Sequence, residues 1–198
     1  RFPMPGLIPP VASERDGLLA ALAQQRYILR IATYGLSDDQ ARAVPSASVL
    51  SVGGLVKHAA ATERGWMDIA LERPHAGSMG DYEANFALQP GETLEEVLAG
   101  YDRVARDTEA VLDGIADLGQ PVPVPPGVPW FPDDVDAWSV RWVLLHLITE
   151  TARHAGHADI VRESIDGATA YPLMAAVEGW PVTPWMQPWT PDGAPTPV

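Results

Sequence analysis

Four long segments of this sequence repeat apolar residues at helical spacing, and this pattern limits the fold more than any other feature. A helix with about three apolar residues in every two turns has one face that must be buried against other helices. The segments span residues 13–35, 51–71, 93–118 and 139–165. No convincing strand pattern and no repeat of fixed period accompanies them. The sequence therefore predicts an all-α protein, a four-helix bundle.

Side chains that favour helix starts support these boundaries. Ser13 and Ser139 stand at predicted N-cap positions, and "TLEE" from Thr93 has the form of a capping box. Gly53 and Gly54 lie near the start of the second helix. A glycine pair there indicates either a close approach to another backbone or a loose first turn.

Proline divides the chain into three predicted parts. Residues 1–12 contain four prolines and are expected to form an arm, residues 13–167 the bundle, and residues 168–198 a Pro/Trp-rich extension. Within the bundle, "GQPVPVPPGVPWFPDD" has six prolines and is expected to be an extended linker. We expect the extension to pack on the bundle or on a partner subunit, with its tryptophans as packing anchors, namely Trp180, Trp185 and Trp189.

Charge and composition exclude several classes of function. The chain has 13 basic and 26 acidic residues, and Lys57 is the one lysine. Because phosphate-backbone binding needs clustered Lys and Arg, nucleic acid and anionic membranes are poor partners. No apolar run reaches the ~20 residues that span a bilayer, and no signal peptide is visible, so a cytoplasmic location is expected. Cysteine is absent, so any thiol chemistry would need a cosubstrate thiol.

The fourth segment carries an unusual group of polar side chains, in "ETARHAGHAD". Glu150 and His154 are four residues apart, and His146 and His157 fall on the same narrow stripe at a step of about 100° per residue. This stripe overlaps the edge of the apolar face of the helix. In the second segment, His58 also lies on an apolar face. Two helices therefore direct imidazoles inward.

A divalent metal would compensate for burying these groups, since an unsatisfied buried polar group costs about 1–3 kcal/mol. Glu150 and His154 can reach one ion, and His58 can supply a third ligand from the facing helix. Two His and one carboxylate leave a coordination position open, which is typical of a catalytic site. Zn²⁺ fits these ligands best, and Ni²⁺, Mn²⁺ or Fe²⁺ remain open.

Other interpretations of the same residues stay open. Glu150 can instead form a buried ion pair with Arg153 or Arg141, and His146 taken alone is typical of a satisfied core histidine. His75, in a glycine-containing loop, is expected to have no role in the site.

Three motifs resemble one known group of proteins. They are "WSVRWVLLHLITETARHAGHADIVRESIDG", "LVKHAAATERGW" and "SDDQARAVPSA". Together they make residues 14–167 similar to the DinB-like four-helix-bundle superfamily, in the branch related to mycothiol-dependent maleylpyruvate isomerases. The resemblance implies a divalent metal held by His58, Glu150 and His154, with His157 just outside the ligand set. Those isomerases have a further C-terminal domain, which about 30 residues replace here, so the isomerase reaction itself is not implied.

The activities known in this superfamily are mostly thiol-linked, with mycothiol, bacillithiol or glutathione. We therefore expect a transferase in which the metal lowers the pKa of a cosubstrate thiol, which then attacks an electrophile. His157, or His146 one turn away, would orient a ligand or move a proton, and Arg153 or Arg141 would hold an anionic substrate. Metal-dependent hydrolysis and non-catalytic binding of a metal or small ligand are the alternatives. A homodimer is possible.

Overall fold

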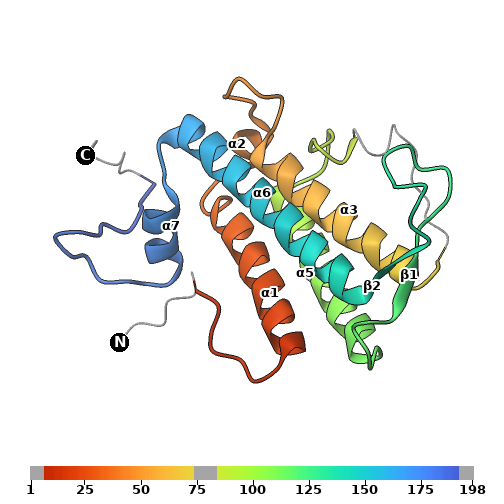
Figure 1. The fold of residues 1–198 in the computed structure, drawn as a ribbon. Helices are drawn as coiled ribbons and strands as arrows, with labels where there is room; N and C mark the ends of the chain where they lie inside the picture. Colours follow the sequence, from red (N-terminus) through yellow and green to blue (C-terminus); the bar gives the residue numbers. More distant parts are fainter. Residues whose placement is uncertain (1–6, 74–83, 192–198) are drawn as a thin grey trace.

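Four long helices packed side by side form the body of the protein (Figure 1). The structure is a computed structural model, and it describes residues 7–73 and 84–191. The helices are α1 (Glu14–Ile31), α3 (Val52–Ala70), α5 (Leu94–Asp113) and α6 (Val140–Asp166). Helix α6 packs against α1 and α3, and α3 also packs against α5. The predicted all-α fold is confirmed.

The predicted helix starts are confirmed by their caps. The side chains of Ser13, Thr93 and Ser139 each accept a hydrogen bond from a backbone N–H in the first turn of α1, α5 and α6. Thr93 and Glu96 form the full capping box. These bonds satisfy N–H groups that the helix itself leaves without a partner.

Two helix ends differ from the prediction. Helix α1 ends at Ile31 and α5 ends at Asp113, four and five residues before the predicted ends at 35 and 118. After α5 the chain turns at Gly114 and returns to the core with Leu118, which is 6% exposed. Apolar residues keep their helical spacing beyond the end of α5 because the turn that follows is also buried. Periodicity alone therefore overestimates the length of α5.

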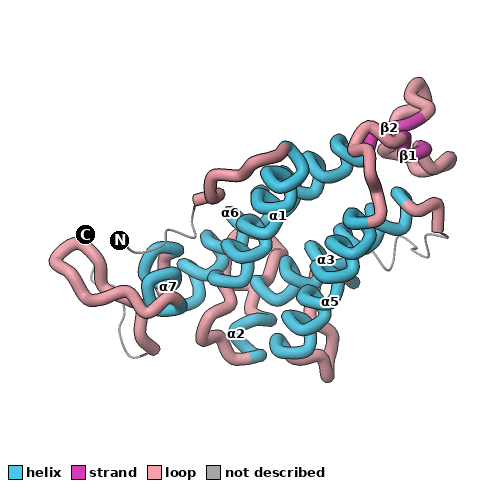
Figure 2. Tube along the Cα trace, turned by 90° about the horizontal axis from the view of Figure 1, so that it is seen from below, coloured by secondary structure: helices cyan, strands magenta, loops and turns pink. Residues whose placement is uncertain are grey.

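Outside the four long helices, the described residues also form short elements, of which the sequence indicates only the first, as one turn of helix within residues 36–45. The polar connection after α1 contains α2 (Asp38–Arg42), which has its own capping box. The proline-rich linker contains β1 (Pro121–Pro123), paired antiparallel with β2 (Ala137–Ser139). The extension contains α7 (Ala170–Val177). Figure 2 shows the strand pair and α7 at opposite ends of the bundle.

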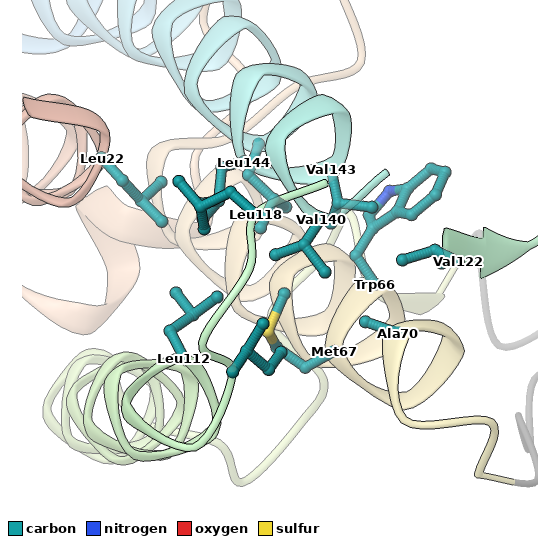
Figure 3. Packing of buried hydrophobic residues seen from close by; sticks show 12 residues of the cluster. Leu22, Trp66, Met67, Ala70, Leu112, Leu118, Val122, Val140, Val143 and Leu144 are labelled. Atoms are coloured by element: carbon teal, nitrogen blue, oxygen red, sulfur yellow. The ribbon is translucent and has the colours of Figure 1, made fainter. Parts of the chain in front are cut away.

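A continuous apolar core fills the space between the helices around the start of α6. Leu22 from α1, Leu112 from α5, and Val143 and Leu144 from α6 are each at most 1% exposed (Figure 3). Trp66 of α3 lies at the edge of this cluster. Each long helix contributes its apolar face, so burial of these faces against one another holds the bundle together.

The core also contains an ion pair between α1 and α3. The guanidinium of Arg26 donates to both carboxylate oxygens of Glu63, at 2.6 and 3.0 Å. Arg26 is 7% exposed and Glu63 1% exposed. A second carboxylate, Glu109 of α5, lies 3.2 Å from Arg26 and is half-exposed. The pair links α1 to α3 inside the bundle, and each buried charge has the other as its partner.

The described part of the extension packs on the bundle at the end of α6. Leu173 and Met174 of α7 pack with Ile31 of α1, and Trp189 also contacts this cluster. The fully buried Arg162 donates to two carbonyl oxygens after α1 and lies 4.9 Å from the Trp189 ring. Of the three expected anchors, Trp180 and Trp189 pack on this cluster.

Trp185 differs from the other two tryptophans, since it is 74% exposed and does not act as an anchor in the described structure.

Among residues 7–73 and 84–191, no helix combines the length and apolarity that crossing a bilayer requires. His75 lies outside the described residues.

Asp159 of α6 gives the fold a pH dependence. Burial, and then the neighbouring Glu163 carboxylate, raise the pKa of Asp159 from 3.8 to about 6. The folded state therefore favours the protonated form, and the ionised form costs stability above about pH 6. We expect Asp159→Asn to raise the free energy of unfolding at pH 7.5 by on the order of 1 kcal/mol, because the side chain is only partly buried and solvent screens it.

Urea denaturation at pH 7.5 and pH 4 measures this effect. The gain should disappear at pH 4, where the wild-type carboxyl group is protonated in the folded state. Parallel pH profiles for the variant and the wild type would contradict the assignment.

Candidate metal centre

Three side chains from two helices meet at the contact between α3 and α6. His58 lies on α3, and Glu150 and His154 lie one turn apart on α6. The Nε2 atoms of His58 and His154 lie 3.3 and 3.1 Å from the same oxygen, Oε1 of Glu150. One donor atom from each residue lies within 4.8 Å of the other two. The structure thus brings together the three residues that the sequence singled out.

These groups are largely shielded from solvent. His58 is 3% exposed and His154 8%, and Glu150 is partly buried. Hydrogen bonds from His154 and then His58 hold the pKa of Glu150 well below its usual range, against the effect of burial. A carboxylate kept ionised beside two imidazole nitrogens is a donor set of the kind that binds Zn²⁺ and other first-row ions. The residues therefore fit a divalent metal.

The alternative ion pairs of Glu150 are not formed. Arg141 bonds to Glu14 of α1 through two nitrogens, at 2.6 and 3.0 Å. Arg153 is exposed on α6, and within the described parts of the chain no hydrogen bond or ion pair reaches it. Glu150 instead contacts the two histidines. The role expected for Arg153 toward a substrate stays a prediction.

His157 lies beside the three residues. Its Nδ1 is 3.4 Å from Nδ1 of His154, on the side of that ring opposite to Glu150. With a metal bound, a proton on Nδ1 of His154 would donate to His157 and leave the Nε2 lone pair free to bind the ion. This arrangement is typical of an outer partner that orients a metal-binding histidine. His157 is itself exposed, so it can also exchange protons with water.

The connection before α5 covers His58, which the sequence did not predict. The ring of Phe86 stacks on His58, with centroids 3.8 Å apart and planes 19° apart. The backbone reaches this place because α3 begins with Gly53 and Gly54. A methyl group on Gly54 would overlap the carbonyl of Phe86, and one on Gly53 would overlap Leu88. The glycine pair thus marks a close backbone approach.

Ionic contacts hold the same connection against α3. The ammonium group of Lys57 lies 2.8 Å from both carboxylate oxygens of Glu92, and Arg42 of α2 donates to the backbone carbonyl of Glu92. The one lysine of the chain therefore has a structural role beside the histidine that follows it.

Replacing Gly54 tests the role of this close approach. Gly54→Ala should cost about 1–3 kcal/mol of stability, because the Phe86 backbone must shift in a packed region. Urea denaturation measures the loss. Gly156→Ala is the matched control, since a methyl group at this helical position meets nothing within 4 Å. This control should raise stability by roughly 0.5–1 kcal/mol. Losses of equal size in the two variants would contradict the close approach.

His146 is not part of the donor set. Its ring lies 4.7 Å from that of Trp66 on α3 and stacks on Trp142 at 5.3 Å. Burial lowers the pKa of His146, with a smaller opposing effect from the Glu150 carboxylate. The interpretation of His146 as a packed histidine therefore agrees with the structure, although its neighbours are aromatic rings rather than hydrogen-bonding groups.

Comparison with known proteins gives the family. Residues 17–167 match the mycothiol-S-transferase family. A solved structure of a conserved protein from Enterococcus faecalis is similar, with a TM-score of 0.57 and 15% identity over 80% of this chain and 100% of that chain. At this identity the likeness concerns the fold. Among curated proteins, no sequence matches this chain. The expected DinB-like relationship is confirmed, and the chain belongs to the mycothiol-S-transferase family.

Proposed function

We propose that this protein is a divalent-metal-dependent transferase that joins the sulfur of a mycothiol-like thiol to an electrophile. In the reaction, the thiol loses its proton, a carbon–sulfur bond forms, and the leaving group departs with its electron pair. The observation that carries the proposal is the approach of two imidazole nitrogens to one carboxylate oxygen at the α3–α6 contact. The family match supports the thiol as the cosubstrate.

His58, Glu150 and His154 would hold the metal. When bound, a divalent ion would supply the positive charge that lowers the pKa of a thiol and so favours the thiolate. Zn²⁺ suits the two imidazoles and one carboxylate best. With three protein ligands a position is left for the cosubstrate, as in catalytic zinc sites.

The neighbouring residues have separate tasks in this proposal. His157 fixes the ring of His154 through the contact between their Nδ1 atoms and passes the thiol proton to water. Phe86 shields one face of His58 from water. Arg153, exposed one residue before His154, is available to an anionic group of the substrate.

A conjugation assay tests the proposal. Metal-free and Zn²⁺-loaded protein are incubated with mycothiol and monochlorobimane, and the fluorescent thioether is followed. The loaded protein should accelerate product formation, and the metal-free protein should not. The same assay without thiol, with loss of chloride as the readout, tests the hydrolytic alternative. Equal rates for loaded and metal-free protein would contradict a metal-dependent transferase with this substrate pair, and thiol-independent turnover would indicate hydrolysis.

A further inference from the structure

Two rings on α6 and one on β2, just before it, form a stacked column that leads away from the candidate metal centre. Trp138, Trp142 and His146 are spaced four residues apart, and we call them the aromatic ladder. The centroids of Trp138 and Trp142 are 4.8 Å apart with planes at 7°, and those of Trp142 and His146 are 5.3 Å apart with planes at 1°. Glu150 occupies the next place in this four-residue spacing.

The ladder lies on the same contact between helices as the three metal-binding candidates. Trp66 of α3 closes its inner side, with centroids 5.2, 5.4 and 4.7 Å from those of the three ladder rings. On α3, Trp66 is two turns after His58, so the two helices run antiparallel along this contact. At a rise of about 1.5 Å per residue, His146 precedes Glu150 by ~6 Å and Trp142 precedes it by ~12 Å.

Packing of the core does not account for the whole ladder. Trp66 is 7% exposed and Trp138 packs partly against the core, but Trp142 is 39% exposed. Trp142 therefore offers an aromatic edge to solvent two helical turns before Glu150. A binding site that combines apolar rings with a few placed polar groups is typical of small-molecule recognition.

The chemistry of the ladder indicates what it would bind. Its members are two indoles and an imidazole whose pKa is lowered by burial. The nearest arginine in sequence, Arg141, is bonded to Glu14 of α1. The surface is therefore aromatic and not cationic. Trp142 stacks between Trp138 and His146, so a ligand meets the exposed edge of its ring. A flat, conjugated ligand suits this edge, because an edge-to-face contact with an aromatic ring adds to the gain from buried area.

We propose that the aromatic ladder binds the electrophilic substrate and that the part of the substrate it contacts is uncharged, planar and conjugated. The proposal rests on the proposed function for the identity of the ligand as the electrophile. Sulfur would be delivered from the Glu150 end of the contact, and the ladder would hold the flat part of the acceptor beside it. Trp142 is then a residue that determines specificity and not a ligand to the metal.

Binding to the metal-free protein tests the ladder without requiring turnover. The probe is a dimethyl bimane, which is planar and lacks a leaving group, and its dissociation constant is measured by fluorescence anisotropy. Trp142→Ala should weaken binding about threefold to tenfold, the range expected for one aromatic contact. Trp142→Phe, which retains a ring, should restore most of the affinity. Trp185→Ala is the control, since this exposed tryptophan lies in the extension at the other end of α6 (Figure 1).

The outcomes distinguish failure of the ladder proposal from failure of the proposed transferase function. Equal affinity of the wild type and Trp142→Ala, or an equal loss in Trp185→Ala, overturns the ladder proposal. A parallel titration with mycothiol shows whether the rings hold the sugar of the thiol instead. If Trp142→Ala weakens mycothiol binding and leaves bimane binding unchanged, the proposal is also overturned. If the conjugation assay fails while Trp142→Ala still weakens bimane binding, the transferase is contradicted and the ladder as a binding site for planar compounds is supported.

Discussion

Replacing His154 with alanine should abolish stoichiometric metal binding while leaving the helical bundle intact. The side chain supplies one of the three donors that the described residues bring together at the α3–α6 contact, so its loss leaves one imidazole and one carboxylate to hold the ion. Loss of an outer partner of a metal ligand already costs about 10–100-fold in affinity, and we expect loss of a ligand to cost more than about 100-fold. Elemental analysis after dialysis against Zn²⁺, with far-UV circular dichroism, provides the measurement.

Two histidines on the same helix provide matched controls for this experiment. His157→Ala removes a ring that contacts His154 but not Glu150, so metal should remain, with affinity lowered by about 10–100-fold at most. His146→Ala changes a ring that stacks on Trp142 and should retain full stoichiometry. Thermal stabilisation by Zn²⁺ should follow the same order, since ligand binding to the folded state raises stability by about 2.7 kcal/mol at 100 times Kd. Full metal retention by His154→Ala would refute the proposed ligand set.

The second large effect concerns the buried ion pair between α1 and α3. Arg26→Met should lower the free energy of unfolding by about 3–5 kcal/mol, because it leaves the Glu63 carboxylate, 1% exposed, without its partner. The double variant with Glu63→Leu should recover most of this loss, since an apolar pair of similar volume replaces both charges. Chemical denaturation of the wild type, the single variant and the double variant measures the interaction.

An exposed ion pair of similar geometry serves as the control. Arg141 and Glu14 also form two hydrogen bonds between helices, but both side chains lie at the surface. Arg141→Ala should therefore have a much smaller effect than Arg26→Met. Comparable losses for the two substitutions would show that burial of the Arg26–Glu63 pair does not determine its contribution.

The sequence was sufficient to predict the four helices and to select the three residues that meet between them. The starts of α1, α5 and α6 were predicted because capping by Ser13, Thr93 and Ser139 is a local interaction. His58 and Glu150 were selected because each lies on or beside the apolar face of its helix, and such faces must meet in a bundle.

Elements that depend on distant contacts were not predicted. Helix α7 has only eight residues, and helices of this length form through packing rather than through their own propensity. The stack of Phe86 on His58 depends on a loop whose path no periodic pattern specifies. The double glycine at residues 53 and 54 indicates either a close backbone approach or a loose first turn, and it does not show which backbone approaches α3. The four-residue spacing of Trp138, Trp142 and His146 is visible in the sequence, but spacing alone does not predict that the three rings stack.

The cover over His58 comes from a connecting segment and not from a helix of the bundle. Phe86 reaches the imidazole through a loop that is held by Lys57, Glu92 and two glycines. Substitutions at Phe86 can therefore change the surface that covers His58 while the residues of α3 and α6 keep their positions. If the proposed function holds, related proteins could differ in the loop, and so in the compounds they accept, while the helices that carry the candidate metal ligands stay the same.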